Sequence, residues 1–178
     1  MTTFQIIDAK PWHCGRMARL LRSEHAQAIA MIGIDSHREL RDKFDQSSFR
    51  RGWLIDGDLA GLGGVTGDAL SAVGFVWLAL SNKAMKYPVA IVKEARRQLD
   101  EIMEVKRELV TTILDGDESS KRFAAFLGLF PADAFAYSPS SSSRYGRRRI
   151  LEAFKQTESR IAFGRGVSTV VSYRLEAA

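Results

Sequence analysis

The stretch VGFVWLALSNKAMKYPVAIVKEARRQLDEIMEV, residues 73–105, decides the fold. Its first part, 73–80, is almost wholly apolar, which predicts a buried strand and is too short for a membrane span. Pro88 then heads a segment with helical period, because a missing N–H is tolerated in the first turn of a helix. The apolar stripe of this helix is Ile91, Val92, Ala95, Leu99, Ile102 and Met103. We therefore expect a strand, a loop over 81–87 and a helix packed on the sheet, an arrangement that often binds an anionic ligand at the helix N-terminus.

Composition indicates one domain with a substantial core. The chain has 178 residues, of which 46% are hydrophobic, and a second full domain would not fit. The formal net charge of +5 only weakly suggests a nucleic-acid partner, because much of the excess falls in one short basic run. Cys14 is the single cysteine, which excludes an intrachain disulfide and fits a reducing compartment. The N-terminus lacks a secretory pattern and no segment is apolar for long enough to cross a bilayer, so we expect a cytoplasmic protein without a membrane partner.

The first half of the chain predicts a strand at 4–8, helices near 12–22, 26–34 and 36–45, and a β-hairpin of 51–56 and 58–66. In the first helix the residues expected to point inward are Met17, Leu20 and Leu21, and those expected to point outward are Arg16, Arg19 and Arg22. Asp56-Gly57 provides the tight turn of the hairpin. The GLGGVTG sequence at 61–67 fails the spacing of a dinucleotide fingerprint and precedes a strand, so its glycines indicate a bulge or close packing.

The second half predicts a strand at 108–114 and a helix at 119–127. The expected apolar face of this helix is Phe123, Phe126 and Leu127. Asp117 has the position of an N-cap or first-turn acid, and Gly128 has that of a C-cap.

The C-terminal part differs in composition. YSPSSSSRYGRRR, residues 137–149, joins a serine-rich linker to a basic run. We expect a core over 1–136 and an extension over 137–178, with a helix at 150–159 and a hairpin of 160–163 and 167–175. We expect residues 138–178 to dock to another protein. The alternative is contact with nucleic acid, through phosphates bound by Arg144, Arg147, Arg148 and Arg149.

The order of these elements is similar to that of the GNAT acyltransferase superfamily. Two stretches make the resemblance more specific. One runs from Trp77-Leu78 through Tyr87-Pro88 into the basic helix, and the other is DESSKRFAAFLGL at 117–129. Both resemble the small GNAT-like internal virion proteins of short-tailed phages. The resemblance covers residues 4–130. It implies an α/β fold of the α+β type, whose mixed central sheet splays between its fourth and fifth strands to admit acetyl-coenzyme A. It also implies a location in the host cytoplasm or in a phage virion, with a virion protein as the partner of residues 138–178.

The resemblance further implies which residues surround the cofactor. In this chain they are Trp77, Leu78, Ala79, Asn82, Lys83, Ala84, Met85, Lys86, Asp117 and Ser120. The loop SNKAMKYP lacks the glycines of the family's Gln/Arg-x-x-Gly-x-Gly/Ala motif, which let phosphates approach backbone amides. Asp117 stands where the family has Asn, and Ala124 stands where it often has the Tyr that protonates the leaving thiolate.

No side chain stands out as a catalytic base. The candidates are Asp68, Asp117 and Glu118, because loops could place them near the cleft, and each is otherwise a helix cap or a solvated carboxylate.

Histidine and cysteine chemistry is not indicated. His13, His25 and His37 fall on different elements and show no metal-ligand spacing with Cys14, so no metal site is expected. Cys14 also has no recognisable partner base for a nucleophilic role.

Two functions of different class are consistent with the sequence. The first is an acetyl-CoA-dependent N-acetyltransferase, in which an amine attacks the thioester directly. The second is a catalytically degenerate GNAT fold that serves as a structural or interaction protein of a phage virion. The glycine-free loop and Ala124 favour the second function, and the retained strand, helix and cleft elements favour the first.

Overall fold

The computed structural model describes residues 2–31, 33–114, 116–131 and 170–176. Its strands are β1 Phe4–Asp8, β2 Ser47–Ile55, β3 Asp58–Thr66, β4 Val73–Leu80, β5 Glu108–Leu114, β6 Phe130–Pro131 and β7 Val170–Glu176. Its helices are α1 Pro11–Leu20, α2 Ser23–Met31, α3 Ser36–Asp45, α4 Pro88–Met103 and α5 Glu118–Phe126, with a 3₁₀ turn, η1, at Ala84–Lys86. The predicted tight turn between β2 and β3 is confirmed, since Asp56 and Gly57 both have positive φ.

The strands form one mixed sheet in the order β1-β2-β3-β4-β5-β7-β6. All neighbouring strands are antiparallel except β4 and β5, which are parallel. The predicted α/β class with a mixed central sheet is therefore confirmed. The parallel pair β4–β5 therefore divides the sheet into two halves. One half consists of β1, β2, β3 and β4, and the other consists of β5, β7 and β6.

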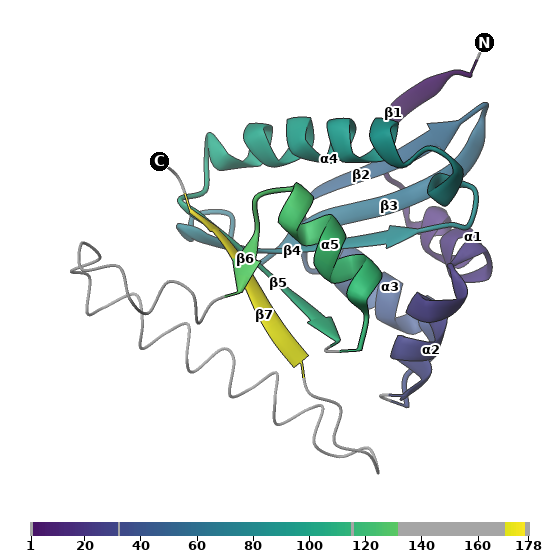
Figure 1. Cartoon of the computed structure of the whole chain (residues 1–178), viewed down its shortest axis with the longest axis horizontal. Helices are drawn as coiled ribbons and strands as arrows, with labels where there is room; N and C mark the ends of the chain where they lie inside the picture. Colours follow the sequence, from purple (N-terminus) through teal and green to yellow (C-terminus); the bar gives the residue numbers. More distant parts are fainter. Residues whose placement is uncertain (1, 32, 115, 132–169, 177–178) are drawn as a thin grey trace.

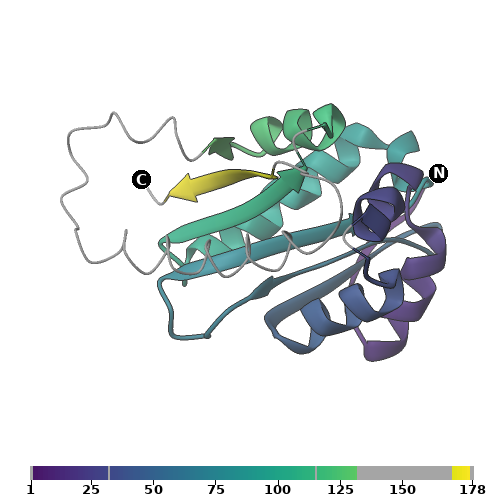
Figure 2. The same cartoon turned by 90° about the horizontal axis from the view of Figure 1, so that it is seen from below.

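Helices cover both faces of the sheet (Figures 1 and 2). On one face α1, α2 and α3 pack around Met17, Leu40 and Phe44. On the other face α4 and α5 cover the sheet, with Ile91 and Leu99 in the core. This removal of apolar surface from water is the main stabilising contribution to the fold. None of the helices in the described part of the chain is long and apolar enough to cross a bilayer.

The end of α1 differs from the prediction. The helix stops at Leu20, and Leu21 has an extended backbone with φ −51° and ψ 139°. Because the helical rotation ends there, Leu20 is 38% exposed while Leu21 and Arg22 are both buried, at 8%. The expectations that Leu20 points inward and Arg22 outward are therefore wrong.

The apolar face of α5 is also shifted. Ala124 is buried, whereas Phe126 is 61% exposed, so the expectation that Phe126 belongs to the apolar face is wrong. The carbonyl of Phe126 instead accepts a hydrogen bond from Arg96 Nε of α4 at 2.8 Å, which ties the end of α5 to α4. The predicted caps are confirmed: Asp117 accepts from the Ser120 amide at the N-terminus of α5, and Gly128 has φ +83° at its C-terminus.

The last strand of the chain belongs to the central sheet. The period-2 pattern at 167–175 predicts a strand with a packing partner, and β7 pairs along its whole length with β5, from Glu108↔Glu176 to Leu114↔Val170. The other expected elements of the extension, at 150–159 and 160–163, lie outside the described residues. Residues 170–176 therefore complete the core sheet.

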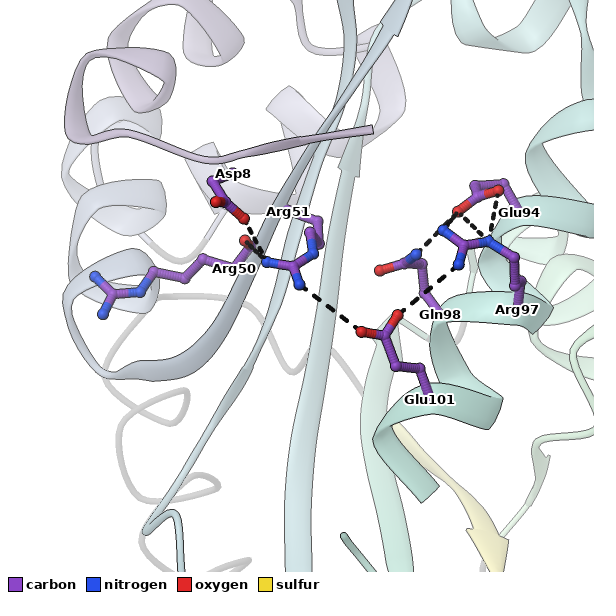
Figure 3. Close-up of polar contacts among 7 residues, drawn as sticks. All are labelled: Asp8, Arg50, Arg51, Glu94, Arg97, Gln98 and Glu101. Atoms are coloured by element: carbon purple, nitrogen blue, oxygen red, sulfur yellow. Dashed lines mark hydrogen bonds and ion pairs between the residues drawn. The ribbon is translucent and has the colours of Figure 1, made fainter. Parts of the chain in front are cut away.

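A polar network fixes α4 over the β1–β2 edge of the sheet (Figure 3). Arg51 Nη1 of β2 donates to Asp8 Oδ1 of β1 at 2.7 Å, and Arg51 Nη2 lies 3.8 Å from Glu101 Oε1 of α4. Glu101 in turn neighbours Arg97, whose guanidinium is 2.6 Å from Glu94 Oε1. Partly exposed pairs of this kind contribute little energy individually, so the network mainly sets the position of the helix.

The glycines of β3 permit close packing of three strands. An added Cβ at Gly64 would lie 2.5 Å from the Phe49 carbonyl oxygen and 3.1 Å from Trp77 Nε1. At Gly63 it would lie 3.0 Å from the Trp77 carbonyl oxygen. These contacts agree with the close-packing interpretation of GLGGVTG, since no helix follows β3.

We expect Gly64→Ala to lower the free energy of unfolding by about 2–3 kcal/mol, because its methyl group meets a backbone oxygen that cannot move without shifting β2. Urea unfolding followed by circular dichroism measures this loss. Gly116→Ala is the matched control, since a Cβ there meets nothing within 4 Å. Equal stability of the two variants would contradict the close-packing interpretation.

Candidate functional site

The sheet opens between β4 and β5. The two parallel strands are in register only at Val73↔Glu108, Gly74↔Leu109 and Phe75↔Val110. Beyond Phe75, β4 remains paired with β3, while β5 remains paired with β7. The two strands therefore diverge toward their carboxyl ends and leave a V-shaped gap, whose mouth faces the loop 81–87 and the N-terminus of α5.

The chain's own backbone reaches the open edge of β4 at this mouth. The Ser81 amide donates to the Ala60 carbonyl of β3 at 2.9 Å, so the neighbouring Leu80 carbonyl points the other way, toward β5. That carbonyl accepts a hydrogen bond from the Arg22 amide at 3.1 Å, and Leu21 forms an isolated antiparallel bridge with Ser81. The segment between α1 and α2 thus occupies the last hydrogen-bonding position of the open edge.

The Arg22 side chain then crosses the mouth to α5. Its Nη2 lies 3.2 Å from Asp117 Oδ2 and 2.6 Å from Ser120 Oγ, and its Nη1 lies 3.4 Å from Ser119 Oγ. The ion pair is shielded, with the Arg22 side chain 10% exposed and the Asp117 side chain 17% exposed. One residue therefore joins β4 by its backbone and α5 by its side chain, on the two sides of the V.

The electrostatics of the mouth keep Asp117 ionised and His25 neutral. Burial acts to raise the pKa of Asp117, but hydrogen bonds from Ser120 and the charge of Arg22 outweigh it and lower the pKa. His25 of α2 has a pKa lowered to about 4, first by burial and then by the positive charges of Lys43 and Arg22. At neutral pH the cluster therefore holds one matched pair of charges beside an uncharged imidazole.

The loop after β4 folds on itself. The amide of Ala84 donates to the Ser81 carbonyl, that of Lys86 to the Lys83 carbonyl and that of Tyr87 to the Ala84 carbonyl. Ala84 is buried, at 1% exposure, and packs beneath α4 with Ile91. These three amides are therefore engaged within the loop and are not available to a phosphate group.

Solved structures match this chain over nearly its whole length, whereas no family model and no curated protein matches it. A GNAT-family acetyltransferase from Bacillus anthracis superposes with a TM-score of 0.63 at 9% identity, covering 97% of this chain and 94% of that one. YncA from Salmonella typhimurium, solved with its cofactor acetyl-CoA, gives a TM-score of 0.58 at 14% identity, covering 97% and 93%. This chain has the GNAT acetyltransferase fold. An aminoglycoside acetyltransferase in complex with coenzyme A also matches, with a TM-score of 0.53 at 13% identity, covering 72% of this chain and 85% of that one.

In this GNAT fold the residues expected around the cofactor do not all face the V. The Trp77 indole turns toward β2 and donates from Nε1 to Ser47 Oγ at 2.9 Å. Ala79 is buried in the cluster with α1, and Leu78 packs against the cluster with α4. The expected loop residues that are exposed are Asn82, Met85 and Lys86. Of the expected set, Asp117 and Ser120 lie at the mouth, where both contact Arg22.

The candidate bases have structural partners. Asp68 lies in the turn before β4, at the other end of this strand from the loop 81–87, where its Oδ1 accepts from the Leu70 amide. The same turn is held by buried Lys106, whose ammonium donates to the carbonyls of Asp68, Ala69 and Ser71. Glu118 is exposed and pairs with Lys121 at 2.7 Å. Asp117 is the N-cap of α5 and the partner of Arg22.

The remaining histidines and the cysteine also have structural partners or positions. His13 Nδ1 accepts from the Lys10 amide at 2.8 Å at the start of α1, and burial lowers the pKa of its imidazole. His37 lies near the start of α3, against Gly15 of α1. Cys14 is fully buried, and burial raises the pKa of its thiol, which disfavours the thiolate. No group of three metal-ligating side chains comes together among the described residues.

The residues present do not fit acetyl-CoA in the way that the sequence resemblance implies. Three amides of the loop 81–87 are used within the loop. Asp117, a carboxylate, stands where the family has Asn, and Arg22 spans the mouth from Leu80 to Asp117. A polyanionic cofactor would have to displace a shielded ion pair and then face the released carboxylate. We therefore derive no catalytic step through it.

Sequence reasoning missed Arg22, the residue on which the site depends. The helical pattern predicts α1 through residue 22, and neither glycine nor proline marks its actual end. The only available indication is Ser23, a typical helix N-cap residue, which is compatible with a helix boundary immediately before it.

We expect Arg22→Met to lower the free energy of unfolding by about 2–3 kcal/mol, because it leaves the Asp117 carboxylate shielded without its cation. Adding Asp117→Asn, which retains a capping side chain, should recover part of the loss. A double-mutant cycle measured by urea unfolding gives the coupling energy. Arg38→Met is the matched control, because its pair with Asp42 is exposed on both sides. Strictly additive effects of the Arg22 and Asp117 substitutions would contradict the described contact.

Stability should fall as the pH drops from 6.5 toward 4. The unfolded chain takes up a proton at His25 near its ordinary pKa, whereas folded His25 resists protonation until about pH 4, so acid favours the unfolded state. We expect a loss of about 1–2 kcal/mol between pH 6.5 and 4.5 in wild type, after allowance for solvent screening, and a smaller loss in His25→Gln. Urea unfolding at the two pH values measures the difference. An identical pH dependence in both proteins would contradict the low pKa of His25.

Proposed function

We propose that this chain uses the GNAT fold as a protein-interaction module without acetyl transfer, in the manner of the small internal virion proteins of short-tailed phages that its sequence resembles. The observation that carries the proposal is the Arg22 bridge, which joins the open edge of β4 to Asp117 and Ser120 across the mouth of the V. The glycine-free loop 81–87 and the absence of a tyrosine at position 124 support the same conclusion.

The chemistry of the bridge explains why it opposes cofactor binding. Coenzyme A is anionic, and a ligand entering the mouth would have to replace the hydrogen bonds that Arg22 makes to the carboxylate and the two hydroxyl groups. Removing a cation from a shielded carboxylate is costly, since the carboxylate keeps its desolvation penalty without its partner. Lys83, one of the two lysines in the loop, is also engaged, at 2.8 Å from Asp58 Oδ2.

Acetyl-CoA-dependent N-acetyl transfer is the second candidate function. It is favoured by the splayed β4 and β5 strands and by matched structures that contain acetyl-CoA or coenzyme A. For this chain it would require the mouth to open, with Arg22 leaving Asp117.

A thermal-shift titration with acetyl-CoA separates the two candidates. We expect no saturable rise in Tm at millimolar cofactor, whereas a ligand present at one hundred times its dissociation constant adds about 2.7 kcal/mol of stability. The Salmonella protein solved with acetyl-CoA is the positive control for the assay. A saturable rise for this chain that disappears in Lys83→Glu would overturn the proposal and favour the enzyme. Detection of the chain by mass spectrometry in purified phage particles tests the virion assignment separately.

A further inference from the structure

A hollow lies on the α1 face of the sheet and borders the loop 81–87 and the Leu21–Ser81 bridge. It is an open cleft of about 550 Å³, lined by Arg16, Arg19 and Leu20 of α1, Asp58 of β3, and Asn82 and Lys83 after β4. Asp58 opens β3, and β3 pairs with the edge of β4 that faces away from β5. The cleft therefore lies on the β3 side of β4 and shares Leu21, Ser81, Asn82 and Lys83 with the region around the loop 81–87; we name it the α1 cleft.

The α1 cleft carries more positive charge than its own carboxylate neutralises. Asp58 is held by Lys83 at 2.8 Å and by Arg16 at 3.7 Å, and the hydrogen bond from Lys83 is the main reason that the pKa of Asp58 is lowered. Arg19 also lines the cleft, and no ion pair involves it within the described ranges. On its other side Arg19 borders a smaller hollow of about 400 Å³. Three cations and one carboxylate thus line the cleft, and two of the cations, Arg16 and Lys83, already contact this carboxylate, while Asp35 lines the smaller hollow on the other side of Arg19.

Leucine side chains also line the cleft, beside the polar residues Ser81 and Asn82. Leu21 and Leu59 line it and are buried at 8% and 1% exposure, while Leu20 beside them is 38% exposed. The outer face of α1 continues this surface, since Trp12 lies eight residues before Leu20, on the same side of the helix, and is 69% exposed. Arginines at the hollow, with an exposed tryptophan further along the same helix, are residue types enriched in interface hot spots.

We infer that the α1 cleft binds an acidic segment of a partner protein, whose apolar side chain enters between Leu20 and Leu59 while its carboxylates bind Arg16 and Arg19. Two observations favour a protein segment over nucleic acid: the floor is apolar, and the outer face of α1 offers Trp12 as its only exposed aromatic residue, where single-stranded nucleic acid stacks successive bases on several. The inference rests on the proposed function, because it names the kind of partner that an interaction module of this shape would take.

Fluorescence anisotropy with a model peptide tests the inference. The probe is a short fluorescein-labelled peptide with a central leucine flanked by glutamates, and the reference probe has glutamine in place of each glutamate. We expect the glutamate peptide to bind the wild-type chain at low salt, and its affinity to fall about tenfold in Arg19→Glu, which corresponds to about 1.4 kcal/mol. Leu20→Ser, which removes an apolar side chain without changing the net charge, should weaken binding as well.

Lys93→Glu is the matched control. Lys93 is exposed on α4, on the other face of the sheet, so this variant makes the same change in net charge without touching the α1 cleft. Four outcomes would each overturn the inference: no binding by wild type, equal binding of the glutamine peptide, equal loss in Lys93→Glu, or tighter binding of a single-stranded oligonucleotide that is also lost in Arg19→Glu. Lys83 lines this cleft as well as the loop 81–87, so the thermal-shift titration with acetyl-CoA is repeated on Arg19→Glu, and a rise in Tm that this variant retains is assigned to the cofactor site and not to the cleft. Cofactor binding alone would overturn the proposed function, and failure of peptide binding alone would overturn only the acidic partner.

Discussion

The contact between Arg22 and Asp117 holds together the two halves of the sheet where strand hydrogen bonds no longer do so. The β1–β4 half and the β5, β7, β6 half share only three residue pairs, all near the start of β4. At the other end of β4 the connection passes through the Arg22 amide on Leu80 and the Arg22 guanidinium on Asp117. The gap that this fold creates is therefore bridged from within the chain.

Shielded ion pairs contribute more to the choice of one arrangement than to total stability. Removing two charged groups from water costs about as much as their attraction returns, so the net contribution of the Arg22–Asp117 pair is small as long as both partners are present. When one partner is lost, the other remains shielded from water as an unpaired charge, and its full desolvation penalty then lowers the free energy of unfolding. The two serine hydroxyls and the capped helix of α5 lessen this cost by completing the hydrogen bonds of the pair, which fixes α5 relative to β4.

Local patterns in the sequence predict most elements of the fold, and long-range contacts account for what they miss. β5 begins and ends at the predicted residues, and α4 begins at Pro88, because apolar periodicity and proline chemistry act over neighbouring residues. The partner of β7 is not predictable in the same way, since its pairing with β5 joins distant parts of the chain. The site depends on Arg22, whose burial follows from a helix end that no glycine or proline marks.

The end of α1 connects the two surfaces on which the functional interpretation depends. Because the helix stops at Leu20, the extended backbone at Leu21 directs Arg22 into the mouth of the V, while Arg19 and Leu20 remain on the outer face beside the α1 cleft. One more helical turn would carry residue 22 round toward solvent and leave the Leu80 carbonyl without its donor. The same helix end thus places Arg22 across the V and leaves the basic and apolar side chains of Arg19 and Leu20 on the outer surface, so a change in where α1 ends would alter both surfaces together.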